Sequence, residues 1–161
     1  MRTLDKFFAL INENNPFLHV DTNIEVWRKV EEFMGTTRPV EHREFDQVIA
    51  ATEKLILRAI ISYLINFQPE KERNYSTIAD LLRAGLVEDE NGKTELDTLF
   101  DWVAENHEDA FCVNQYFTAK HIDKNFEDAA ICLLDRLTVL EILEKDKLKQ
   151  ENMHDDKIIT K

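Results

Sequence analysis

The longest stretch of the chain with few charges runs from Phe45 to Phe67. Apolar residues recur along it with the 3.6-residue period of an α-helix and cover most of its circumference. Glu53, Lys54 and Arg58 predict one narrow strip that faces water. The apolar run is interrupted by Arg58 and falls short of the about 20 residues needed to cross a bilayer. We therefore expect a long, buried central helix that packs against neighbours on several faces.

Shorter segments with the same apolar period lie on both sides of this stretch. Polar clusters, or links that contain glycine or proline, separate them, and such links end helices. Thr94 followed by Asp97 has the spacing of a capping box, which marks the start of a helix. The expected helices cover residues 3–14, a segment that ends near residue 34, and residues 77–84, 94–106, 108–120 and 125–148. Asp21, Thr22 or Asn23 is expected to cap the second of these, and Ser76 the third.

The apolar positions of two of these helices predict their inner faces. In residues 22–34 the positions expected to face the core are Ile24, Trp27, Val30 and Phe33 or Met34. In residues 94–106 they are Leu96, Leu99 or Phe100, and Val103.

Composition agrees with helices and not with a sheet. Three glycines and three prolines in 161 residues leave few tight turns. The length suits one domain with its own core. We expect an all-α fold, a single-domain bundle of about six to seven helices around the central helix. Residues 1–148 form this domain, and residues 149–161, where the apolar period ends, are expected to be a flexible C-terminal tail.

Negative charge is concentrated in one part of the chain. The net charge is −12, and the segment from Glu88 to Asp109 holds nine acidic residues against one basic residue, Lys93. Such a segment repels phosphate backbones and anionic lipid and attracts basic proteins. The plainer alternative is a solvated surface that keeps the protein soluble. The candidate protein-binding surface consists of Glu88, Asp89, Glu90, Glu95, Asp97, Asp101, Glu105, Glu108 and Asp109.

Residue patterns for catalysis, cofactors or metals are not visible. The glycines lie far apart in the sequence, so no loop can cradle a phosphate group. Of His107, Glu108 and Cys112, only the last two would share a helix face, which is too few for a metal site. We therefore expect no catalytic, cofactor-binding or metal-binding residues, and an isolated chain that is not an enzyme.

Cys112 and Cys132 form no CxxC motif, and we expect two free thiols in a reducing compartment. The N-terminal apolar segment is too short and too polar at its flanks for a signal peptide. These features predict a cytoplasmic location. Direct binding to DNA is a weaker alternative, which rests on four basic residues in or near the loop expected over residues 36–43. They are Arg28, Lys29, Arg38 and Arg43.

Part of the chain resembles a known family. The run ATEKLILRAIISYLINFQPEKERNYSTIADLL ends at Leu82 and combines a long apolar helix, a short link with proline and glutamate, and an Arg-Asn-aromatic-Ser step into a second helix. Residues 96–100 (LDTLF) and 113–117 (VNQYF) follow in the same order. This sequence resembles the all-α domain of conjugative type IV secretion coupling proteins, which are membrane-anchored, DNA-pumping ATPases. The Pro-Phe-Trp step that often opens the first helix in that family is missing, since Arg43-Glu44-Phe45-Asp46 stands there.

The resemblance implies a substrate-receptor module for conjugative DNA transfer. Its partner would be a relaxase or an accessory factor, and the parent protein would be a hexamer although the isolated domain is a monomer. The domain would lie at the cytoplasmic face of the membrane without touching it. Two alternatives remain open: direct contact with DNA within the transfer machinery, and a free-standing helical regulatory or interaction protein.

Overall fold

The computed structural model describes residues 17, 20–37, 47–122 and 126–159, with side chains up to Met153. Six α-helices and one short 3-10 helix make up most of these residues, and the described part of the chain has no strand beyond a single bridge between Glu88 and Thr94. The all-α class is therefore confirmed. The helices are α2 (Asn23–Thr36), α3 (Gln47–Phe67), η1 (Glu70–Glu72), α4 (Tyr75–Ala84), α5 (Glu95–Asn106), α6 (Phe111–Ile122) and α7 (Phe126–Ile159). The helix expected over residues 3–14 lies outside the described residues.

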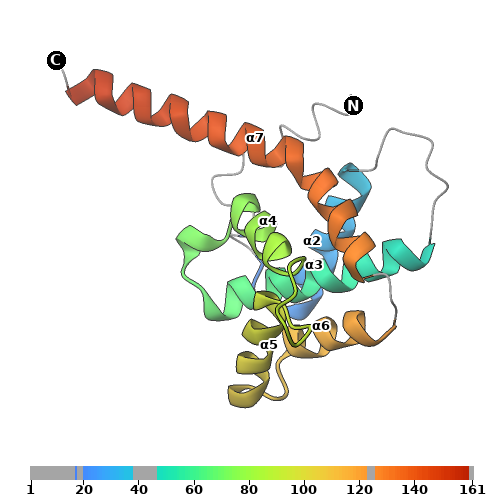
Figure 1. Ribbon diagram of the computed structural model, residues 1–161. Helices are drawn as coiled ribbons and strands as arrows, with labels where there is room; N and C mark the ends of the chain where they lie inside the picture. Colours follow the sequence, from blue (N-terminus) through green and yellow to red (C-terminus); the bar gives the residue numbers. More distant parts are fainter. Residues whose placement is uncertain (1–16, 18–19, 38–46, 123–125, 160–161) are drawn as a thin grey trace.

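Helix α3 contacts α2, α4, α6 and α7 (Figure 1). Its apolar residues between Ile56 and Leu64 are almost completely buried. The prediction that Glu53, Lys54 and Arg58 face water is wrong for two of the three residues. Glu53 is only 3% exposed, and Arg58 is only 7% exposed. Two of the charged groups on this helix, those of Glu53 and Arg58, therefore lie inside the bundle, against partners from other helices.

Glu53 is held by Arg136 of α7, which lies 83 residues further along the chain. The guanidinium Nε donates to Glu53 at 2.6 Å, and Nη1 donates to the main-chain oxygens of Met34 (3.3 Å) and Thr37 (3.1 Å) at the end of α2. Burial raises the pKa of Glu53, and the hydrogen bond and charge of Arg136 oppose this rise. This cluster joins three helices at one point.

Helix α2 turns a different face toward the core from the one expected from its apolar positions. Thr22, one of the three residues expected to cap it, accepts from the main-chain N–H of Glu25. Val26 and Val30 are fully buried, whereas Ile24 is 67% and Trp27 is 47% exposed. Trp27 instead covers Arg58, whose guanidinium carbon lies 3.7 Å from the centre of the indole ring. A cation–π contact of this kind keeps one face of the indole ring packed while leaving about half of the side chain open.

Helix α4 is held at its first turn by α7. Asn74, two residues before the expected cap Ser76, is the N-cap of α4 and accepts from the main-chain N–H of Thr77. The Glu144 carboxylate accepts from the first N–H groups of α4, at Tyr75 (3.2 Å) and Ser76 (3.1 Å). Carboxylates are favourable there because these N–H groups have no partner within the helix.

Beyond Glu144, α7 continues as a helix that projects away from the other helices (Figure 1). The side chains of residues 148–153 are exposed. Residues 149–159, within the expected C-terminal tail, are thus helical. Their flexibility stays a prediction.

Candidate protein-interaction surface

The nine acidic residues begin in a tight turn between α4 and α5. One oxygen of the Asp89 carboxylate accepts from the main-chain N–H groups of Asn91 (2.8 Å) and Lys93 (3.0 Å). Gly92 has φ +74°, a conformation that favours glycine. Asp89 therefore shapes the turn, while Glu88 and Glu90 are exposed beside it.

Asp97 does not belong to the open surface. Thr94 and Asp97 form the expected capping box, with both reciprocal hydrogen bonds present at 3.0 Å. The Tyr116 hydroxyl donates to Asp97 Oδ1 at 2.5 Å, and Lys120 Nζ lies 3.2 Å from the same oxygen. Burial alone would raise the pKa of Asp97, but the hydrogen bonds from Tyr116 and Thr94 and the nearby Lys120 lower it overall. Asp97 thus joins α5 to α6 as a carboxylate.

Tyr116 is suited to this role because it is fully buried and stays protonated. Its ring stacks on Phe100 of α5, with centroids 4.1 Å apart. Burial and then the neighbouring Asp97 carboxylate raise the pKa of the Tyr116 hydroxyl. Asp101 is also partly neutralised, because Lys93 Nζ lies 2.7 Å from its Oδ2.

The other acidic residues are exposed, and two of them share a face of α5 with a tryptophan. The inner face of α5 is as expected, with Leu96, Phe100 and Val103 buried. The exposed residues of α5 recur at helical spacing on the outside. They are Glu95, Thr98, Trp102, Glu105 and Asn106. Trp102 is 55% exposed. We call this line of residues the α5 outer face.

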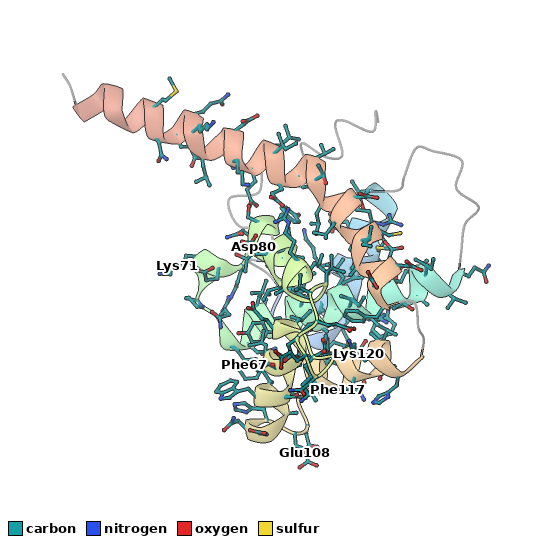
Figure 2. All side chains as sticks on the ribbon, viewed as in Figure 1. Phe67, Lys71, Asp80, Glu108, Phe117 and Lys120 are labelled. Atoms are coloured by element: carbon teal, nitrogen blue, oxygen red, sulfur yellow. The ribbon has the colours of Figure 1, made fainter. Side chains whose placement is uncertain are left out.

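Glu108 and Asp109 follow in the turn between α5 and α6, where they lie beside a cleft. Figure 2 shows Glu108 at the end of the molecule away from α7. The cleft has a volume of about 560 Å³, and α3, the first residue of α2 and this turn surround it. His107 lies against Phe67 at its edge, with ring centroids 4.9 Å apart. Acidic residues thus lie both on the α5 outer face and, in the turn that follows it, beside a hollow in the molecule.

Cys112 also lines this cleft but is not set up as a nucleophile. A thiol in the first turn of a helix often has a lowered pKa. Here burial raises the pKa of Cys112 to about 11, so the thiol stays protonated at neutral pH. Among the described residues no three histidine, cysteine or acidic side chains gather as a metal site would require.

The basic residues proposed for DNA do not form a patch where the structure describes them. Arg28 is exposed on α2, whereas Lys29 is 8% exposed and lies 3.9 Å from Glu32. Arg38 and Arg43 lie outside the described residues. No helix in the described part of the chain has the length and apolar character to span a membrane.

Comparison of the chain with protein-family models, with curated proteins and with solved structures finds no match. Function is therefore argued from the surface itself.

Sequence reasoning included Asp97 in the surface and missed Trp102. The capping-box spacing was the signal that Asp97 would serve the fold. For Trp102, the signal was its place outside the apolar positions Leu96, Phe100 and Val103. A large aromatic side chain off the core face is an indicator of binding.

Proposed function

We propose that this chain is a protein-docking module that binds a basic partner through the α5 outer face and the neighbouring acidic turns. The observation that carries the proposal is the exposed Trp102 between carboxylates on one face of a rigid helix. Tryptophan is enriched among the residues that dominate binding energy, because its large flat surface loses little conformational entropy on contact. Surrounding charges add attraction and select the partner.

The rigidity of the surface supports this role. Helix α5 is capped by Thr94 and Asp97, stacked on α6 through Phe100 and Tyr116, and joined to it by the Asp97–Tyr116 hydrogen bond. A fixed surface has less entropy to lose on binding than a mobile one. The internal contacts of Asp97 therefore hold in place the helix that carries the exposed residues.

The resemblance to conjugative coupling proteins suggests the biological partner. In that setting the module would receive a relaxase or an accessory factor on the cytoplasmic side of the membrane. Direct DNA contact is the second candidate, and Arg28 favours it. The acidic surface opposes it, because DNA phosphates and carboxylates repel each other.

Fluorescence anisotropy with a labelled peptide of mixed arginine and lysine tests the docking surface. Trp102→Ala should weaken binding about 30-fold, which corresponds to the roughly 2 kcal/mol typical of a central aromatic contact. Reversing the charges of Glu88, Glu90 and Glu105 to lysine should weaken binding about tenfold and reduce its salt dependence. Asp89 is left unchanged because its carboxylate holds the turn.

A matched control keeps the net charge equal. Asp135, Asp146 and Glu151 are exposed on α7, and their reversal to lysine changes the total charge by the same amount. This variant should bind nearly as tightly as the parent protein. The proposal is wrong if the control loses as much affinity as the surface variant, or if Trp102→Ala binds like the parent.

A further inference from the structure

We infer that the cleft beside the α5–α6 turn receives an arginine side chain of the docked partner. This inference rests on the proposed function, since it identifies one anchor within that interface. The cleft and the exposed acidic residues are separate observations: the first is a hollow formed by three helices, and the second is a distribution of charge.

The cleft has more than enough room for one inserted side chain, and its position suits a partner that lies on the α5 outer face. Its volume of about 560 Å³ falls within the range of roughly 300–1,000 Å³ found for small-ligand sites. Asn23 of α2, Ser62, Asn66 and Phe67 of α3, and Glu108 and Asp109 of the turn line it. It follows directly after α5 along the chain, so a partner lying on the α5 outer face can reach it.

The charges at the cleft favour a cation. Glu108 and Asp109 are exposed and contribute two full negative charges. Helices α2 and α6 begin at the cleft, and each helix start carries about half a positive charge. The two carboxylates and the two helix starts together give the cleft a net charge of about −1, so the cleft attracts a positive group.

Residues with hydrogen-bond acceptors line the cleft and add to this preference. The Asn66 side-chain amide donates through Nδ2 to the main-chain oxygen of Ser62 at 2.9 Å. This contact uses the NH₂ group and leaves Asn66 Oδ1 as an acceptor. With the Glu108 and Asp109 carboxylates, it offers acceptors to a group that has several N–H donors.

Aromatic walls distinguish arginine from lysine. The cleft is bounded by Phe67, His107 and Phe111. A planar guanidinium stacks on aromatic faces while its edge donates to carboxylates, whereas a lysine ammonium is more strongly hydrated and lacks a flat face. The cleft should therefore prefer arginine, although the rest of the acidic surface attracts either residue.

Two-dimensional NMR titrations with an oligoarginine peptide and an oligolysine peptide of equal length test this inference. Oligoarginine should bind several-fold more tightly and shift the amide signals of His107, Phe111 and Cys112. Replacing Glu108 by glutamine and Asp109 by asparagine should remove this preference. The matched pair Glu88→Gln and Glu90→Gln, which neutralises the same charge in the other turn, should weaken both peptides equally and keep the preference.

The outcomes separate the cleft from the wider surface. If both peptides bind equally and both variant pairs weaken them equally, the cleft inference is wrong and the docking surface stands. If neither peptide binds, both proposals fail. Inorganic phosphate is the opposite probe, and phosphate-induced shifts at Phe111 and Cys112 without arginine preference would show an anion site and overturn the inference.

Discussion

Replacing Tyr116 by phenylalanine would remove the hydroxyl that joins α6 to the start of α5 while leaving the stack on Phe100. The hydroxyl is buried and donates to the Asp97 carboxylate at 2.5 Å. Hydrogen bonds to charged groups contribute about 1.5–3 kcal/mol. Because Asp97 keeps the Thr94 main-chain N–H and Lys120 as partners, we expect a loss of about 2 kcal/mol in the free energy of unfolding, within that range.

Thermal and urea unfolding at neutral pH measure this loss. About 2 kcal/mol corresponds to a fall in Tm of roughly 4–8 °C for a protein of this size. A double-mutant cycle with Asp97→Asn separates the contact from the helix cap that Asp97 also provides. A coupling energy below about 0.5 kcal/mol would refute the reasoning, because surface substitutions without a specific contact reach that size.

The pH dependence gives an independent check on the same contact. The pKa of Asp97 is lowered from its ordinary value of 3.8, so its stabilising contribution is present above that pH and is lost as pH falls through the folded-state pKa. Without the Tyr116 donor the folded-state pKa rises. The stability difference between Tyr116→Phe and the parent should therefore be constant near neutral pH and shrink below about pH 4. A difference that is unchanged at pH 3 would contradict the role of the ionised carboxylate.

Two further predictions concern α7. Arg136→Met leaves Glu53 buried without its cation and should cost about 3–5 kcal/mol at pH 7 by urea unfolding. The pKa of Glu53, already raised by burial, rises further without Arg136, so this cost should be smaller at pH 5, where more Glu53 is protonated. Adding Glu53→Gln should restore part of the stability, and no recovery would contradict the pairing. A chain ending at Leu148 should unfold within about 0.5 kcal/mol of the full chain, because the side chains of residues 149–153 are exposed. A larger loss would show that residues 149–161 stabilise the domain.

Local sequence determined the helices and several of their ends. The capping box of Thr94 and Asp97 and the inner face of α5 follow from spacing within one helix, so residues a few positions apart contain the necessary information. The Asn91-Gly92 turn is local for the same reason. Charge along the chain likewise identified where the acidic surface lies.

Only the tertiary structure decided which charged and aromatic groups are available to a partner. Glu53 is buried because Arg136 reaches it from α7, and Asp97 is removed from the acidic surface because Tyr116 and Lys120 reach it from α6. The cleft exists because the start of α2, the end of α3 and the α5–α6 turn meet. These pairings depend on the packing of distant segments, so the periodicity and charge of any single helix cannot specify them.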